Sequence, residues 1–258
     1  MDELTGLSGA STEARLRSVG AGIGLTVAGF VTALVVLLLG VQVLAAVGIP
    51  VQERPVLAIG LAIVLQGLGF GIAVAVYMAL TRDFDLLRYR LPTLRDLGWA
   101  VGGLIALFVG YAAIAAVVSQ LGLDTAQNSI VEQGRQNPEL VLYLIPLAIL
   151  VVGPSEELLF RGAIQGVLRR AYAPVPAIVI ASALFGVAHV FALSGSGTGV
   201  IVYIAVTFVL GCILGYVYER TSNLVVPALI HGVYNAILFS LLYVQVSGRA
   251  CSYTPLTL

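Results

Sequence analysis

Charged residues are scarce in this sequence. Asp, Glu, Lys and Arg make up 10% of the 258 residues, and 59% are hydrophobic. A soluble domain carries about 25% charged residues, so this chain has too little polar surface to cover a water-soluble globule. All thirteen basic residues are Arg, none is Lys, and the formal net charge is zero. The sequence therefore lacks the basic surface typical of nucleic-acid binding.

Cysteine and histidine are almost absent as well. The two cysteines, Cys212 and Cys251, lie in an apolar segment and in the C-terminal tail, and they predict neither a disulfide framework nor a thiolate metal site. The two histidines, His189 and His231, both lie within long apolar segments. Because an ionisable side chain is costly inside a membrane, these positions indicate either a buried partner or a function.

Long apolar segments predict an all-α membrane bundle of about seven transmembrane helices. The first segment runs to about Pro50, too long for the roughly 7–15 apolar residues of a signal peptide. Each segment supplies the roughly 20 residues that cross about 30 Å of hydrocarbon. The predicted helices cover residues 19–49, 55–81, 97–121, 139–170, 174–194, 199–218 and 223–246.

Two prolines interrupt the fourth apolar segment, and Pro154 could divide it into two shorter segments because proline removes a helical hydrogen bond. The most polar connections, 82–96 and 122–138, are too short to separate domains. We therefore predict one membrane domain over residues 1–258, with a core at 146–240 that carries the polar motifs described below.

Arginine placement predicts the orientation. With seven spans, nine arginines fall on the side of the N-terminus and three on the opposite side. The positive-inside rule then predicts a cytoplasmic N-terminus, an external C-terminus and an integral protein of the cell membrane. The nine are Arg15, Arg17, Arg82, Arg88, Arg90, Arg95, Arg169, Arg170 and Arg220; the three are Arg54, Arg135 and Arg249.

The fourth segment contains two adjacent carboxylates, Glu156 and Glu157, followed by Arg161. On a helix Glu157 and Arg161 are four residues apart and can form an ion pair. Glu156 points about 100° away from Glu157. The spacing predicts one neutralised carboxylate and one that is available to a site, although a solvated helix end would also explain the three charges.

Two further pairs of polar or aromatic residues lie one helical turn apart, Phe185 with His189 and His231 with Asn235. At 1.5 Å per residue, Glu156, His189 and Asn235 lie about 18–22 Å from the predicted cytoplasmic ends of their helices, and His231 lies about 12 Å away. Either pair alone is explained by packing or by hydrogen bonds between helices. Together with Glu156 they predict one buried site.

A carboxylate and an imidazole can take a proton from water, while a second imidazole and an amide can stabilise an oxyanion. The same Glu and two His could instead hold Zn²⁺ or another divalent metal. The residues leave both schemes open, and both lead to hydrolysis of a peptide bond. A serine nucleophile is disfavoured because Ser194-Gly195-Ser196-Gly197 is typical of a flexible turn.

These motifs resemble those of the CAAX prenyl endopeptidase and bacteriocin-processing (CPBP) family of intramembrane proteases. That family carries Glu-Glu-x-x-x-Arg, Phe-x-x-x-His and His-x-x-x-Asn motifs. Here they begin at Glu156, Phe185 and His231, in the same order, and the resemblance covers about residues 146–240. The resemblance implies a hydrolase, an endopeptidase of glutamate or metallo type that acts on a peptide or membrane-anchored protein substrate in the lipid bilayer.

The resemblance also implies roles for single residues. Glu156 activates water with help from His189, while His231 and Asn235 stabilise the oxyanion. Glu157, Arg161 and Phe185 support the site. If the enzyme uses a metal, the implied ligands are Glu156, His189 and His231.

Two other classes of protein remain as alternatives. Intramembrane Glu and His also serve as proton relays in transporters, but we find no second broken helix to pair with the one at Pro154. A non-catalytic scaffold or immunity protein would keep the fold, yet it would not need the complete set of motif residues.

Overall fold

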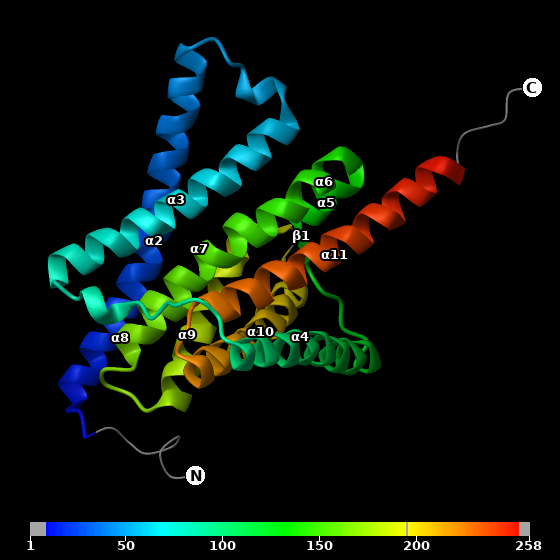
Figure 1. Cartoon of the computed structure of the whole chain (residues 1–258). Helices are drawn as coiled ribbons and strands as arrows, with labels where there is room; N and C mark the ends of the chain where they lie inside the picture. Colours follow the sequence, from blue (N-terminus) through cyan, green and yellow to red (C-terminus); the bar gives the residue numbers. More distant parts are fainter. Residues whose placement is uncertain (1–8, 195, 253–258) are drawn as a thin grey trace, which may run out of the picture.

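The computed structural model describes residues 9–194 and 196–252. Within these ranges seven helices are long and apolar enough to cross a membrane, which confirms the predicted all-α polytopic bundle (Figure 1). The spans are α2 (Thr12–Ala46), α3 (Pro55–Thr81), α4 (Leu94–Gln120), a composite fourth span (Pro138–Leu168), a fifth span formed by α9 (Pro174–Ala188) and the 3-10 turn η5 (His189–Ala192), α10 (Thr198–Thr221) and α11 (Val225–Ser252).

Two helices, α2 and α4, begin three or more residues before their predicted starts. The helix α2 begins at Thr12 rather than at 19, because the Ser11 side chain caps it by accepting a hydrogen bond from the backbone N–H of Ala14. The helix α4 begins at Leu94 rather than at 97, because Thr93 and Asp96 form a capping box. In both places the cap extends the helix beyond the apolar segment.

The fourth span is one continuous rod rather than the two segments that Pro154 could have produced. It runs through α6 (Pro138–Leu147), the π-helical turn η3 (Ala148–Val152), α7 (Gly153–Glu157), a second π-helical stretch η4 (Leu158–Gln165) and α8 (Gly166–Leu168). A π-helical turn is wider than an α-helical turn and is frequent at functional sites. The two wide turns flank the short segment that carries Glu156 and Glu157.

The composite span and α11 form the centre of the bundle. Half of the most apolar stretch of α11 is buried, against 11% for α2 and α4, so those two helices lie at the periphery. In Figure 1 the α2–α3 hairpin lies on one side of this centre, and α4 and α10 lie on the other. Large apolar side chains such as Leu38 and Val101 are exposed on the outer helices, as expected for surfaces that face lipid.

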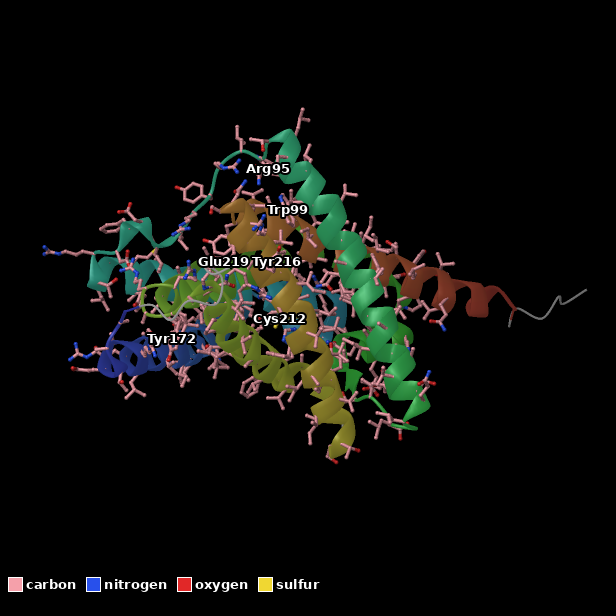
Figure 2. The ribbon with its side chains drawn as sticks, turned by 90° about the horizontal axis from the view of Figure 1, so that it is seen from below. Arg95, Trp99, Tyr172, Cys212, Tyr216 and Glu219 are labelled. Atoms are coloured by element: carbon pink, nitrogen blue, oxygen red, sulfur yellow. The ribbon has the colours of Figure 1, made fainter. Side chains whose placement is uncertain are left out.

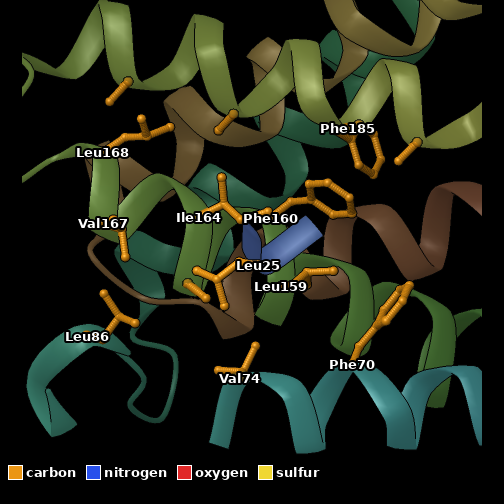
Figure 3. Close-up of a cluster of buried hydrophobic side chains, with 14 of the residues drawn as sticks. Leu25, Phe70, Val74, Leu86, Leu159, Phe160, Ile164, Val167, Leu168 and Phe185 are labelled. Carbon is orange, nitrogen blue, oxygen red and sulfur yellow. The ribbon is translucent and has the colours of Figure 1, made fainter. Parts of the chain in front are cut away.

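Two clusters of buried apolar side chains hold the bundle together. The first joins α2, α3, η4 and α9 through residues such as Phe70, Phe160 and Phe185 (Figure 3). The second joins α4, α10 and α11 through residues such as Leu107 and Ile230. Residues of α7, η4, α9, η5 and α11 form the candidate site described below.

Two glycines allow the composite span and α11 to approach backbone to backbone. A Cβ atom added at Gly153 would lie 2.6 Å from the carbonyl oxygen of Ala228, and one added at Gly232 would lie 2.8 Å from the carbonyl oxygen of Ala148. Small residues permit such close packing of helices in membranes. This approach brings His231, the neighbour of Gly232, against Glu157.

Replacing Gly232 by alanine is therefore expected to destabilise the protein by about 1–3 kcal/mol, the usual cost of overpacking. The added methyl group must push α11 away from the composite span. Thermal unfolding in detergent measures the effect, with Gly248→Ala as the matched control, because a Cβ at Gly248 of the same helix would meet nothing within 4 Å. Equal melting temperatures for the two variants would contradict this packing.

Two connections predicted as loops contain regular structure. The strand β1 (Gln127–Asn128) pairs antiparallel with β2 (Leu193–Ser194), and the short helix α5 (Ser129–Gln136) follows β1. Because Leu193 and Ser194 form β2, the prediction of a helix to 194 is wrong at these two residues, and the prediction of a flexible turn at 194–197 is wrong at Ser194. Residue 195 lies outside the described residues. The pairing joins segments about 65 residues apart in the chain, so no local pattern indicated it.

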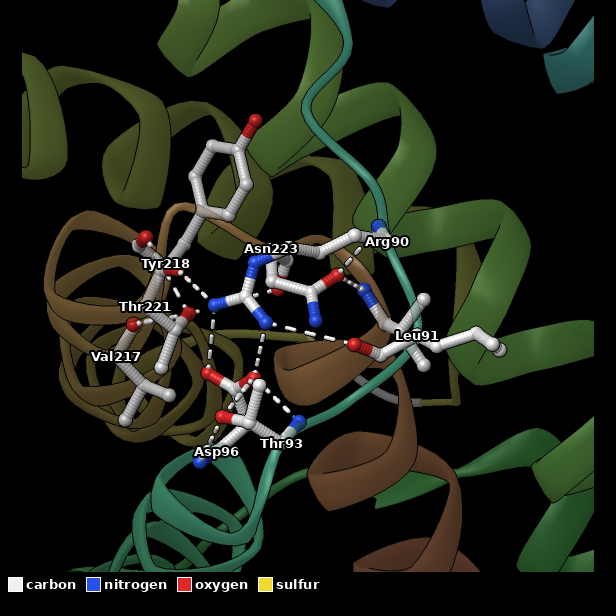
Figure 4. A network of polar contacts seen from close by, with 9 residues as sticks. Arg90, Leu91, Thr93, Asp96, Val217, Tyr218, Thr221 and Asn223 are labelled. Atoms are coloured by element: carbon white, nitrogen blue, oxygen red, sulfur yellow. Dashed lines mark hydrogen bonds and ion pairs between the residues drawn. The ribbon is translucent and has the colours of Figure 1, made fainter.

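The connection between α3 and α4 crosses the bundle and ties together the ends of α10 and α11 (Figure 4). This connection contains the 3-10 turn η2 (Phe84–Leu86). A second 3-10 turn, η1 (Val51–Glu53), lies in the connection between α2 and α3. The guanidinium of Arg90 pairs with the Asp96 carboxylate and donates to the carbonyl oxygen of Thr221 at 3.2 Å. The Arg90 backbone N–H donates to the side chain of Asn223 at 3.1 Å.

Candidate active site

A buried ion pair lies at the centre of the candidate site. The Glu157 and Arg161 side chains are 0% and 1% exposed, and Arg161 Nε lies 3.2 Å from Glu157 Oε2, as the spacing of four residues predicts. The N–H is not aligned as a hydrogen bond, so this contact is an ion pair by distance. Arg161 also donates to the carbonyl oxygen of Gly211 at 3.2 Å and stacks 4.3 Å from the centre of the Phe185 ring.

The same carboxylate holds His231. Glu157 Oε1 accepts a hydrogen bond from His231 Nδ1 at 2.9 Å, across 74 residues of sequence. A carboxylate that contacts Arg161 on one oxygen and His231 on the other is fixed in place, and so it fixes the imidazole. The other ring nitrogen of His231, Nε2, then faces Glu156 at 4.0 Å from its Oε2.

Glu156 differs from its neighbour in having no protein partner at hydrogen-bond distance among the described residues. Its side chain is 15% exposed, and its buried oxygen Oε2 has no hydrogen bond. Native proteins satisfy most buried polar atoms, and an exception needs an explanation such as a catalytic role or a bound water. The distance of 4.0 Å to His231 Nε2 is too long for a direct hydrogen bond.

The Phe185 ring connects the two histidines. Its centre lies 4.5 Å from that of His189 and 5.9 Å from that of His231, both edge to face. It also meets Phe160 of η4 at 5.1 Å. The aromatic ring therefore packs against both imidazoles and against the Arg161 guanidinium.

The hydrogen bond of His189 defines which of its ring nitrogens is free. His189 Nδ1 lies 2.8 Å from the carbonyl oxygen of Phe185, and a carbonyl oxygen accepts, so Nδ1 carries the hydrogen. In the neutral ring the lone pair then belongs to Nε2. His189 is half-buried at the start of η5, directly beyond the end of α9.

Asn235 lies one turn beyond His231 on α11 and is half-buried. Its side-chain amide makes no hydrogen bond to another described residue. Among the described residues, no hydrogen bond joins Glu156 directly to His189. Polar contacts thus link four of these residues: Glu156, Glu157, Arg161 and His231. His189 is linked to them through the Phe185 ring, and Asn235 lies one turn from His231 on the same helix. We refer to these residues as the Glu–His cluster: Glu156, Glu157, Arg161, Phe185, His189, His231 and Asn235.

A polar stripe that the sequence analysis missed continues from the cluster along the composite span. Gln165 is fully buried and donates to Glu219 of α10 at 2.9 Å, and Glu219 pairs with Arg169 at 3.1 Å. Figure 2 shows Glu219 on α10, about one turn beyond Tyr216 and two turns beyond Cys212. The signal was present, because Glu157, Arg161, Gln165 and Arg169 recur every four residues.

The arrangement does not fit a metal ion. No group of three or more His, Cys, Asp or Glu side chains among residues 9–194 and 196–252 is arranged to hold one. The Nε2 atoms of both histidines are free of hydrogen bonds to the described residues, but both imidazoles pack on the Phe185 ring and do not converge with Glu156 as a ligand set. The chemistry below is therefore derived from side chains and water, with no step through a metal.

The fold and the site define a class, namely integral membrane proteins with a buried cluster of Glu, His and Arg inside a helical bundle. Residues 138–237 match the family model described as type II CAAX prenyl endopeptidase Rce1-like. This match confirms, for residues 138–237, the resemblance to CAAX-type intramembrane proteases that the three motifs indicated. Neither the search of curated proteins nor the search of solved structures found a match.

Proposed function

We propose that this protein is an intramembrane endopeptidase in which Glu156 activates a water molecule. The observation that carries the proposal is the buried Oε2 of Glu156, which has no hydrogen bond to a described residue and faces Nε2 of His231. A water molecule that donates a hydrogen bond to this oxygen would satisfy it. As the water oxygen bonds to the peptide carbonyl carbon, its proton passes to the carboxylate.

His189 is proposed to orient this water. Its Nδ1 is held by the Phe185 carbonyl, so Nε2 of the neutral ring is free to accept a hydrogen bond. A water held by two acceptors presents a lone pair to the substrate. When the tetrahedral intermediate collapses and the C–N bond breaks, the protonated Glu156 returns its proton to the leaving amine.

His231 and Asn235 are proposed to stabilise the oxyanion. The Asn235 amide is uncommitted among the described residues, and it can donate to a substrate oxygen. His231, when protonated, carries a second hydrogen on Nε2, and that nitrogen already faces Glu156. Donors fixed before the reaction are effective because they need no reorganisation as charge develops.

Glu157 and Arg161 are proposed to position the site rather than to react. Glu157 orients His231, and Arg161 balances the charge of Glu157, since both side chains of this ion pair are buried. From the arginine placement, we propose that the protein lies in the cell membrane with its N-terminus in the cytoplasm. The proposed substrate is a peptide segment anchored in, or lying against, the bilayer.

The decisive experiment is cleavage by the purified protein in liposomes. A farnesylated CAAX peptide, its unlipidated form and a transmembrane peptide are incubated with the protein in H₂¹⁸O. Mass spectrometry should find one new carboxyl terminus carrying ¹⁸O in at least one peptide, because water is the nucleophile. If all three peptides stay intact, or if the new terminus carries no ¹⁸O, the proposal is wrong.

Cleavage is also expected to persist after dialysis against a chelator, because the described residues contain no arrangement of ligands for a metal. The initial rate of peptide cleavage is compared before dialysis, after dialysis and after addition of Zn²⁺. Loss of activity that Zn²⁺ restores would instead favour the metal scheme with Glu156, His189 and His231 as ligands.

A further inference from the structure

Tyr203 of α10 lies beside the Glu–His cluster and belongs to none of the three motifs. Its ring centre is 6.4 Å from that of His189, and its side chain is half-buried. The helix α10 approaches α9 closely at this level, because a Cβ atom at Gly186 would lie 2.9 Å from the carbonyl oxygen of Ile204. The phenol is therefore held at the wall of the site by backbone packing.

A single hydrogen bond orients the Tyr203 hydroxyl. Asn128 Nδ2 donates to Tyr203 Oη at 3.2 Å, so the phenol oxygen accepts in this bond and its own hydrogen is not used. No acceptor for that hydrogen occurs among the other described residues. The amide thus leaves the hydroxyl with one hydrogen to donate elsewhere.

Asn128 is itself fixed by two further contacts. Its Oδ1 accepts the backbone N–H of Ile130 at 2.9 Å and caps α5. Its backbone pairs with Leu193 in the β1–β2 ribbon, and Leu193 directly follows the η5 turn that begins with His189. The ribbon therefore places the Asn128 amide, and through it the Tyr203 hydroxyl, relative to His189.

The Tyr203 ring also lies beside an imidazole of the Glu–His cluster. A neutral donor beside His189 can bond to a substrate oxygen at the scissile peptide. A hydroxyl present for packing alone would need neither a dedicated amide donor nor a free hydrogen.

We propose that Tyr203 is a further catalytic residue, whose hydroxyl donates a hydrogen bond to the substrate carbonyl oxygen as it becomes an oxyanion, and that Asn128 is its positioning residue. This inference rests on the proposed peptidase function. The proton stays on the phenol throughout, so the step adds a hydrogen bond and transfers no atom. In other enzymes, removing one hydrogen-bond donor to the oxyanion lowers kcat by about 10²–10³-fold.

The test is a double-mutant cycle on peptide cleavage. Tyr203→Phe keeps the ring and removes the donor, and we expect kcat to fall about 100-fold with KM changed less than about threefold. Asn128→Asp keeps the helix cap. It replaces the donating amide by an acceptor, so the phenol turns its hydrogen away from the substrate, and we expect kcat to fall about tenfold or more. In the double variant the second substitution should add nothing, because Asn128 acts through Tyr203.

The matched control is Tyr216→Phe, which removes a hydroxyl from the same helix, where the ring packs on Trp99 (Figure 2). We expect its kcat to equal that of the wild type. A wild-type kcat for Tyr203→Phe, with Glu156→Gln inactive, would overturn the role of Tyr203 and leave the peptidase function standing. Additive losses in the double variant would overturn the role of Asn128. If the wild type cleaves no peptide, both the function and this inference fail.

Discussion

Replacing Glu156 by glutamine is expected to lower the rate of peptide cleavage by at least about 10³-fold while the protein stays folded. General-base catalysis contributes about 10²–10⁴ in rate, and glutamine cannot take a proton from water. Glutamine has nearly the same shape, and Glu156 Oε2 makes no hydrogen bond that the change would break. Single-turnover cleavage in liposomes measures the rate, and thermal unfolding measures the fold.

Two variants serve as controls for this result. Glu139→Gln removes a carboxylate from an exposed position of the same span and should cleave at the wild-type rate. Glu157→Gln still offers an oxygen to His231 Nδ1 and should lose less activity than Glu156→Gln. If the Glu156 variant retains more than a tenth of the wild-type rate, Glu156 is not the base.

Replacing Arg161 by methionine is expected to cost about 3–5 kcal/mol of stability, because the change leaves the buried Glu157 charge without its arginine partner. Methionine fills similar space, so lost packing contributes little. The second substitution Glu157→Gln removes the orphaned charge, and the double variant should regain most of the lost stability. Chemical denaturation in mixed micelles measures the free energy of unfolding of each variant.

Arg169→Met is the matched control for this pair. Arg169 lies two turns further along the same face of the composite span and pairs with Glu219, but its side chain is 32% exposed. Solvent can compensate the Glu219 charge after the change, so the loss should be well below that of Arg161→Met. Equal losses at the two positions would mean that burial of the Glu157–Arg161 pair does not control its energy.

The sequence was sufficient to predict the spans and the meeting of Glu157 with Arg161. Apolar length sets the spans, and helical periodicity sets which side chains share a face. The starts of α2 and α4 were missed because Ser11 and Thr93 determine them through caps, which hydropathy does not register. A search for caps at the polar edge of each apolar segment would have found both.

Tertiary contacts account for what could not be predicted. Asn128 reaches Tyr203 because β1 pairs with β2, and this register depends on strands of two residues without an apolar pattern. The π-helical turns depend on how the composite span packs on α11 at Gly153 and Gly232, whereas Pro154 alone indicated an interruption. A single tyrosine in an apolar helix gives no signal of its own.

The wide turns η3 and η4 also set the phase of the composite span. Each residue advances an α-helix by about 100°. Deleting one residue between Ala148 and Val152 would convert the wide turn to ordinary winding and swing Glu156 and Glu157 around the axis together. The position of the two carboxylates around the helix axis therefore depends on the number of residues in these turns more than on which apolar residues fill them. An insertion or deletion there would move the carboxylates away from both histidines.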